Sequence, residues 1–458
     1  MMYTHKRCLN TAIGFFFLTA VVTQAQLAVS ENGRYLKNAD DTPFYWLGDT
    51  GWALFQKLNR EDVEFYFETR AQQGFSVVHA AVYNVNPFVL PPLSNVYGDI
   101  PFINNDPRQP DVTAGNRFDD AGEYDYWDHV DYVLDTAAVH AIYINLLPIF
   151  GVAEGEGYNF LTPTNAYGYG KFIGKRLRPH TNIIWCMGGD VLADNEIRKA
   201  VWNRLAQGVT EGVAGTEDYS KTLMTYHVRG GRSSTDFFAE AAWLDFHMLQ
   251  TWASYTKIYD AVTSDYNREP VMPILHGEGA YEDGPEYPTK PITPHVIRKQ
   301  AYWAIFAGGF HTYGNSNVWN FGTTPSYVSQ DWKQALRSPG ARHLGVSRDI
   351  LEALKWWTFV PDPSVIAKGA GSGQSLNVAM RSLASDKLIA YLSTASSVTI
   401  DMTKLASRAP ATAIWIDPQT GNKHSIGKIE NASTKEFSTP KGWTDALLLI
   451  EANTGPIK

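Results

Sequence analysis

The sequence predicts an α/β fold: a (β/α)8 TIM barrel over residues 26–360, followed by a C-terminal all-β sandwich module over residues 361–458. Three observations support this prediction. Apolar runs alternate with segments of helical periodicity, which is typical of a parallel sheet. Eight such runs occur, the number that closes a barrel. After the Pro361-Asp362-Pro363 segment the alternation stops, and short strands separated by turns follow.

The eight strand candidates are apolar at most positions, as expected for strands that are buried on both faces. They cover residues 44–50, 75–82, 141–149, 182–190, 223–228, 246–252, 271–279 and 308–315.

Helical periodicity fills the segments between these strands. Asn59 is expected to cap a helix in which Val63, Tyr66 and Phe67 share one face, and Gly74 is expected to end it. Similar patterns precede the third, fourth and eighth strands. Residues 83–123, rich in Pro, Asn and Asp, are interpreted as an insertion after the second strand that overhangs the mouth of the barrel.

The composition and the N-terminus predict an exported protein. A positive segment ending at Arg7 precedes an apolar run over residues 13–22, and Ala25 follows as a cleavage position, so residues 1–25 are predicted to be a signal peptide. The apolar run is too short to span a bilayer, so a periplasmic or extracellular location without membrane insertion is expected. The formal net charge is −8 with no basic block, which argues against a nucleic-acid partner. The oligomeric state stays open.

Chemistry in such a barrel lies at the C-terminal ends of the strands, where three carboxylates occur. Asp49 ends the first strand, Asp190 the fourth and Glu278 the seventh. Glycosidic bond cleavage needs two carboxyl groups, one that protonates the leaving oxygen and one that attacks the anomeric carbon or activates water. The fourth and seventh strands face each other across a barrel, so Asp190 and Glu278 are the candidate catalytic pair, at a retaining separation of about 5–5.5 Å.

Structural interpretations of these residues stay open. A strand-end Asp190 after glycine can instead cap a helix or pair with an arginine. Asp49 is either a ligand of substrate hydroxyls or part of a structural hydrogen bond. Glu282, Asp283 and Glu286 are interpreted as solvated loop charges.

Polar and aromatic side chains near the strand ends complete the candidate site. The predicted substrate-binding residues are Asp49, Trp52, His79, Tyr83, His227, His247, Gln250, Tyr281, His311, Tyr313 and Trp319. No cofactor and no metal ion are expected.

Several motifs resemble the apiosidase-like glycoside hydrolases, long catalogued as a domain of unknown function with an appended β-module named for collagen binding. The motifs cover residues 44–52, 74–78, 244–250, 277–278 and 309–314. The resemblance implies a retaining barrel with Asp190 as the acid/base and Glu278 as the nucleophile. It also implies a pectic substrate, with release of apiose from rhamnogalacturonan II as the family activity. The Gly189-Asp190 ending departs from the Asn-Glu pair that the wider clan has after its fourth strand.

Two other functions stay open. A metal-dependent hydrolase would use histidines on or near the strands, although no His-x-His or His-x-x-x-His pair occurs; these are His79, His227, His247, His276 and His311. A non-catalytic carbohydrate-binding protein would use aromatic side chains and would not need opposed carboxylates; these are Trp46, Trp52, Trp252, Tyr281 and Trp319.

Overall fold

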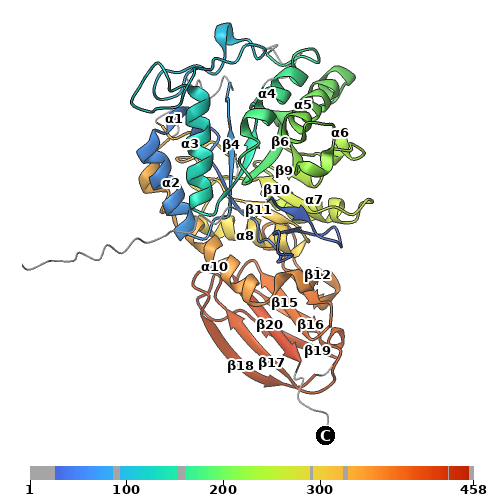
Figure 1. Ribbon diagram of the computed structural model, residues 1–458. Helices are drawn as coiled ribbons and strands as arrows, with labels where there is room; N and C mark the ends of the chain where they lie inside the picture. The colour runs from blue at the N-terminus through green and yellow to red at the C-terminus, as the bar shows by residue number, and fades with distance from the viewer. Residues whose placement is uncertain are drawn as a thin grey trace, which may run out of the picture.

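The computed structural model describes residues 26–85, 93–151, 160–288, 292–322, 328–431 and 433–452. The chain forms a barrel of strands surrounded by helices, with a strand-rich module at one end (Figure 1). The predicted signal peptide lies outside the described residues. A short hairpin, β1 (Ala28–Val29) and β2 (Leu36–Lys37), precedes the barrel.

Eight parallel strands form the barrel. Seven of them fall within a predicted strand, and the fourth extends one residue beyond its predicted end at Asp190. They are β3 (Leu47–Thr50), β4 (Val77–Ala81), β5 (Tyr143–Leu147), β6 (Ile183–Val191), β7 (Met224–Val228), β9 (His247–Gln250), β10 (Ile274–Glu278) and β11 (Phe310–Thr312). The sheet order is β7-β6-β5-β4-β3-β11-β10-β9-β8, in which β8 (Arg232–Ser233) pairs antiparallel with β9. The amide of Asp245 donates to Met224 O at 2.9 Å, which brings the two ends of the sheet together. The predicted TIM barrel is therefore confirmed.

Helices connect these strands along the outside of the barrel (Figure 1). They are α1 (Leu54–Lys57), α2 (Arg60–Gln72), α3 (Tyr126–Val139), α4 (Ala166–Leu177), α5 (Glu196–Ala214), α6 (Thr235–Phe238), α7 (Ile258–Tyr266), α8 (Pro294–Phe306), α9 (Trp332–Ala335) and α10 (Pro339–Ala353). The side chain of Asn59 accepts from the amide of Asp62 at 2.8 Å and so caps α2, as predicted. Val63, Tyr66 and Phe67 are buried on the inner side of this helix.

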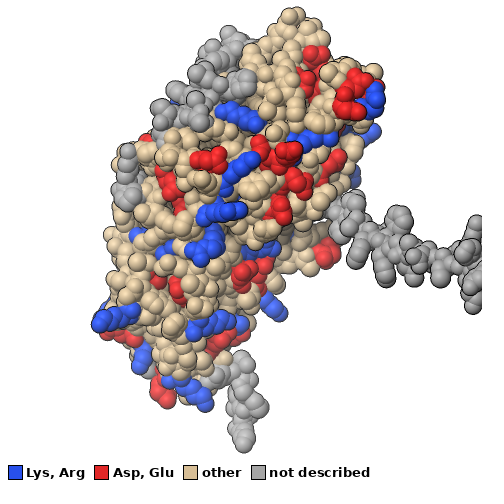
Figure 2. Space-filling view, turned by 90° about the vertical axis from the view of Figure 1, so that its left-hand side faces the viewer, with Lys and Arg blue, Asp and Glu red and all other residues tan. Residues whose placement is uncertain are grey.

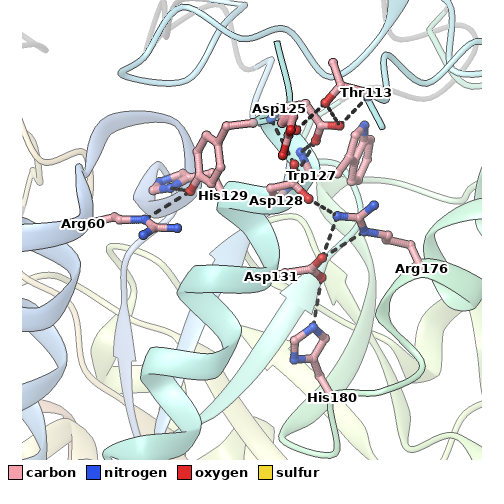
Figure 3. Close-up of polar contacts among 11 residues, drawn as sticks. Arg60, Thr113, Asp125, Trp127, Asp128, His129, Asp131, Arg176 and His180 are labelled. Carbon is pink, nitrogen blue, oxygen red and sulfur yellow. Dashed lines mark hydrogen bonds and ion pairs between the residues drawn. The ribbon is translucent and has the colours of Figure 1, made fainter. Parts of the chain in front are cut away.

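The insertion after β4 lies at the end of the barrel opposite to the module (Figure 1). Residues 86–92 of this segment lie outside the described residues. The remainder contacts the start of α3, where the amide of Thr113 donates to Asp125 Oδ2 at 2.7 Å (Figure 3). Trp127 Nε1 also donates to Pro101 O at 3.1 Å. Asp125 also caps α3 through the amide of Asp128 at 3.0 Å. One aspartate therefore orders both the helix and the insertion.

The C-terminal module is a β-sandwich, as predicted. One sheet has the order β12-β14-β15-β20-β17-β18 and the other has the order β13-β16-β19. The strands are β12 (Phe359–Pro361), β13 (Ile366–Lys368), β14 (Val378–Ser382), β15 (Lys387–Leu392), β16 (Ser397–Asp401), β17 (Ala411–Ile416), β18 (Lys423–Ile429), β19 (Thr434–Ser438) and β20 (Ala446–Ala452). Trp415 is buried in the module core, and Trp443 is half-buried against it.

Helix α8 lies between the barrel and the module, and most of its residues are buried. Arg298 on this helix pairs with Asp445 of the module in two contacts, Nη2–Oδ1 at 2.6 Å and Nε–Oδ2 at 2.8 Å. Trp303 Nε1 donates to Leu376 O at 3.0 Å farther along the helix. Because the ion pair is buried on both sides, loss of one partner would leave an uncompensated charge at the junction.

The surface in Figure 2 carries acidic and basic side chains in a mixed pattern. In the part of the chain that the structure describes, no helix has both the length and the apolar character to cross a bilayer.

Candidate active site

The end of β6 has an irregular backbone that carries Asp190. Gly188, Gly189 and Asp190 all have positive φ values, of 90°, 126° and 60°, and the register with β7 shifts between Gly188 and Val191. A Cβ atom at Gly189 would lie 2.8 Å from the amide nitrogen of Gly151. Glycine is therefore required where this bulge approaches the neighbouring loop, and the bulge sets the direction of the Asp190 side chain.

The Glu278 carboxylate, at the end of β10, is held by neighbouring donors. Gln250 Nε2 donates to Oε2 at 2.5 Å, and Tyr281 Oη donates to Oε1 at 2.6 Å. Tyr281 Oη in turn accepts from Trp52 Nε1 at 3.0 Å. Only 8% of Glu278 is exposed. These short bonds fix the orientation of the carboxylate, because each of its two oxygens is held by a separate donor.

His227, at the end of β7, connects the two candidate carboxylates. Its Nδ1 atom accepts a hydrogen bond from the amide of Asp190 at 3.0 Å, and its Nε2 atom lies 3.0 Å from Glu278 Oε2. Because an amide can only donate, Nδ1 carries no proton and the ring proton is on Nε2, which faces the Glu278 carboxylate. Trp52 packs edge-on against this ring at 5.0 Å between centroids.

The surroundings of Asp190 favour its protonated form. Burial, and next the charge of Glu278, raise the pKa of Asp190 to about 6, against the opposing effects of His227, Arg229 and a hydrogen bond from Gln250. A carboxyl group whose pKa is raised by burial and by a neighbouring carboxylate is the arrangement expected of a general acid. Arg229 was not predicted from the sequence, although its place directly after β7 is a position at the mouth.

Other predicted histidines lie in the barrel interior. His276 Nδ1 lies 2.9 Å from His311 Nδ1, and the two rings are stacked 5.1 Å apart. Thr312 Oγ1 joins His79 Nε2 at 3.1 Å and accepts from Trp46 Nε1 at the same distance. Burial lowers the pKa of all three histidines, that of His311 to about 3. They are therefore neutral hydrogen-bonding groups at ordinary pH.

Asp49 faces away from these carboxylates, toward α2. Its Oδ2 atom accepts from Arg70 Nε at 2.6 Å and from Tyr66 Oη at 2.5 Å, and both side chains of the ion pair are fully buried. Of the two interpretations of Asp49, the structural hydrogen bond is the one observed.

Tyr313 also turns outward. Its hydroxyl donates to Glu282 Oε2 at 2.6 Å, while the amide of Gly340 donates to Glu282 Oε1 at 2.8 Å. Burial raises the pKa of Glu282 to about 7. The interpretation of Glu282 as a solvated loop charge is wrong, because the turn after β11 and the start of α10 enclose it. Asp283, by contrast, is exposed as predicted and accepts from Asn315 Nδ2 at 2.9 Å, while the half-buried Glu286 accepts from Ser316.

Three further predicted residues lie at the edge of the cluster or outside it. His247 is buried near Asp265 and Arg268, at the α7 side of β9. Tyr83 Oη donates to Asn105 Oδ1 at 2.8 Å and so contacts the insertion. Trp319 is 9% exposed, and its Nε1 atom is buried without a protein partner among the described residues.

Across the described ranges of the chain, no three side chains among His, Cys, Asp and Glu are grouped in a way that could hold a metal ion. The residues that the structure brings together are Asp190, Glu278, His227, Gln250, Tyr281 and Trp52.

Comparison with known proteins identifies the family. Residues 30–358 match the family "Apiosidase-like, catalytic domain", and residues 360–451 match the "Putative collagen-binding domain of a collagenase". No curated protein matches the sequence.

Two similar solved structures are glycoside hydrolases. One, described only as a glycoside hydrolase, is 30% identical with a TM-score of 0.80, over 94% of this chain and 98% of that chain. The other, a glycoside hydrolase family 5 protein from Bacteroides vulgatus ATCC 8482, is 30% identical with a TM-score of 0.81, over 94% of each chain. These matches identify an enzyme rather than a non-catalytic carbohydrate-binding protein. The chain belongs to the apiosidase-like family of glycoside hydrolases.

Proposed function

We propose that this glycoside hydrolase acts with retention of configuration, with Glu278 as the nucleophile and Asp190 as the acid/base. The observation that carries this proposal is that the carboxyl groups of Asp190 and Glu278 both contact Gln250, while His227 accepts from the Asp190 backbone amide and lies beside the Glu278 carboxylate. One carboxylate accepts short hydrogen bonds, whereas the other has a raised pKa. This difference assigns the attack to Glu278 and the proton to Asp190.

In the first step a Glu278 oxygen bonds to the anomeric carbon, while the glycosidic oxygen leaves with the proton of Asp190. In the second step Asp190 takes a proton from water, and the water oxygen displaces Glu278 from the sugar. Tyr281 Oη and Gln250 Nε2 hold the carboxylate of Glu278 throughout, so its orientation does not have to be established in each cycle.

Buried polar atoms without protein partners provide contacts for sugar hydroxyls. In the cluster around the two carboxyl groups, Gln250 Oε1 is such an atom among the described residues. An unpaired buried polar atom costs free energy, which a substrate hydroxyl would offset. The site therefore favours a polyhydroxylated ligand.

For the substrate we propose a side-chain sugar of a plant pectic polysaccharide, with apiose in rhamnogalacturonan II as the first candidate. The family match supports this choice. An exported enzyme would meet such a polymer outside the cell. This agrees with the signal peptide proposed for residues 1–25, which precedes the proposed barrel domain (26–360) and module (361–458).

Two measurements test the proposed function. Monosaccharide release from a panel of purified plant polysaccharides, read by chromatography, identifies the sugar. NMR of the product anomer before mutarotation gives the stereochemistry, and a product of opposite anomeric configuration to the substrate would contradict retention.

The roles of the carboxylates are tested with alanine variants. Glu278→Ala should lose turnover on every substrate, because no glycosyl-enzyme forms. In Asp190→Ala, the first step should remain fast for substrates with good leaving groups, because such groups depart without a proton. The second step should be slow, and added azide should restore turnover because it replaces the water that Asp190 activates. Near-normal activity in Glu278→Ala would contradict the mechanism, whereas equal losses without azide rescue would contradict the assignment of roles.

A further inference from the structure

Helix α8 contacts the turn beyond the candidate nucleophile through one side chain. Gln300 on this helix is fully buried, and its side-chain amide forms two hydrogen bonds with the backbone of Ala280. Oε1 accepts from the amide of Ala280 at 2.8 Å, and Nε2 donates to Ala280 O at 2.8 Å. Ala280 is buried and follows Glu278 by two positions in the sequence. Gln300 therefore binds both polar backbone groups of a residue next to the end of β10.

These two bonds do for Ala280 what a neighbouring strand does for a residue within the sheet. β10 ends at Glu278, so Ala280 lies beyond the ladder of the barrel. A buried backbone amide or carbonyl group without a partner costs free energy comparable to a lost hydrogen bond. A side-chain amide offers an acceptor and a donor together, so it satisfies both groups at once. The conformation of the turn therefore depends on α8.

The glycine that follows Glu278 permits this contact. A Cβ atom at Gly279 would lie 2.2 Å from Gln300 Oε1 and 2.9 Å from Cε1 of His276. A side chain at this position would therefore displace the Gln300 amide from Ala280.

The backbone of Ala280 places the next side chain, that of Tyr281. The hydroxyl group of Tyr281 donates to Glu278 Oε1 at 2.6 Å and accepts from Trp52 Nε1 at 3.0 Å. On the opposite side of the turn, the amide of Thr251 donates to Glu278 O at 3.0 Å. A shift of the Ala280 backbone would move Tyr281, and with it a hydrogen bond that orients the Glu278 carboxylate.

Helix α8 is itself fixed by contacts with the module. Besides the buried ion pair at the junction, Lys299 Nζ donates to Gln374 O at 2.8 Å. The ring of Tyr302 stacks on that of Tyr391 with the centroids 4.5 Å apart. These contacts hold the helix against the module, while Gln300 binds the turn at the end of β10.

We propose that Gln300 is a positioning residue for the glycosidase reaction: it fixes the turn through which Tyr281 orients the Glu278 carboxylate. In this role Gln300 acts through the backbone of Ala280 and not on the substrate. The proposal rests on the proposed function in its assignment of Glu278 as the nucleophile. Because a displacement of about 1 Å in a reacting group can cost about 100-fold in rate, loss of Gln300 should lower kcat.

Kinetics of the full chain on the nitrophenyl glycoside of the released sugar test this role. Gln300→Met keeps the length of the side chain but removes both hydrogen bonds. Its kcat should fall roughly 10- to 100-fold, while KM changes by less than about twofold. Lys299→Met is the matched control: it removes a hydrogen bond between the adjacent residue of α8 and the module, and it should leave kcat unchanged. Circular dichroism checks the fold of each variant.

A second variant separates positioning from packing. In Gln300→Glu an ionised carboxylate can accept from the Ala280 amide but cannot donate to Ala280 O, whereas a protonated carboxyl group can do both. Burial favours the protonated form, so the change should occur in the ordinary pH range. The ratio of kcat in this variant to kcat in the unaltered chain should therefore rise as the pH falls. Asp190, Glu278 and His276 are present in both proteins, so the ratio cancels their own titration.

Three results would overturn the positioning role: a kcat in Gln300→Met within about twofold of the unaltered chain, an equal loss in Lys299→Met, or a Gln300→Glu ratio that does not change with pH. If Gln300→Met does not fold, the pH dependence of Gln300→Glu decides. The proposed function is judged separately with Glu278→Ala. An inactive Glu278→Ala beside a fully active Gln300→Met removes only the role of Gln300, whereas near-normal activity in Glu278→Ala contradicts the nucleophile itself.

Discussion

His227 Nε2 lies 3.0 Å from Glu278 Oε2, while the Nδ1 atom of the same ring accepts a hydrogen bond from the amide of Asp190 at 3.0 Å. A single imidazole ring therefore sets the distance and orientation of two residues from opposite sides of the barrel. This contact depends on the ring proton being at Nε2, which the bond from the Asp190 amide imposes.

Replacement of His227 by alanine should therefore lower kcat/KM about 100-fold, because small displacements of paired catalytic groups have effects of this size. The loss should appear mainly in kcat, since the carboxylates would still be present. Steady-state kinetics with circular dichroism as a folding check provide the measurement. His140→Ala, which removes a ring that pairs with Glu64 on the outside of the barrel, should leave kcat/KM unchanged. Unchanged kinetics in His227→Ala would show that the ring has no positioning role.

The raised pKa of Asp190 predicts a specific pH dependence. The protonated carboxyl is the form that donates to the leaving group, so kcat/KM should fall as the pH rises through about 6. Glu278→Gln removes the negative charge that raises this pKa, so the pKa of Asp190 should fall in that variant. Carbon-13 NMR titration of the aspartate carboxyl groups measures the change, and a pKa that stays at the same value would contradict the coupling of the two residues.

Asp49 should affect stability through its buried pair with Arg70. Asp49→Ala leaves the guanidinium buried without its counter-charge, which should lower the free energy of unfolding by about 3–5 kcal/mol. Urea denaturation measures this change. Asp120→Ala, which breaks the exposed pair with Arg117, is the control and should cost about 1 kcal/mol or less. A stable Asp49→Ala protein with a raised KM would instead support a substrate contact.

His180 predicts a loss of stability at alkaline pH. Burial opposes its protonation, but the hydrogen bonds and charges of Asp131 and Asp135 raise its pKa to about 9. Figure 3 shows the contact with Asp131. A pKa raised in the folded state stabilises the protein fully below the unfolded value of about 6.5, and this contribution disappears as the pH rises through about 9.

The effect should be on the order of 1–3 kcal/mol between pH 6 and pH 10. Denaturant titrations at a series of pH values would show it as a slope that His180→Gln removes. An equal slope in both proteins would assign the alkaline destabilisation to other groups.

Much of the barrel follows from local sequence patterns. Runs that are apolar at nearly every position suit strands that are buried on both faces, and each of the eight predicted strands overlaps an observed one. The same patterns located Asp190 and Glu278, because a polar residue that ends a buried strand lies at the mouth. Local capping was also predictable, since the Asn59 side chain needs only the amide of Asp62, three residues away.

The direction of each side chain depended on contacts between distant segments. Asp49 and Glu278 both end a strand, yet Asp49 turns toward Arg70 and Tyr66 on the outside while Glu278 meets Gln250 and His227 on the inside. The burial of Glu282 by Tyr313 and Gly340 could not be predicted from the sequence either, because these partners lie 31 and 58 residues away in the chain. Alternation along a strand assigns a face, but a bulge such as that at Gly188–Val191 changes the face. The tertiary structure decides which partner each charged group contacts. A buried charge without a partner would raise the free energy of the folded state, so each buried charge must be paired.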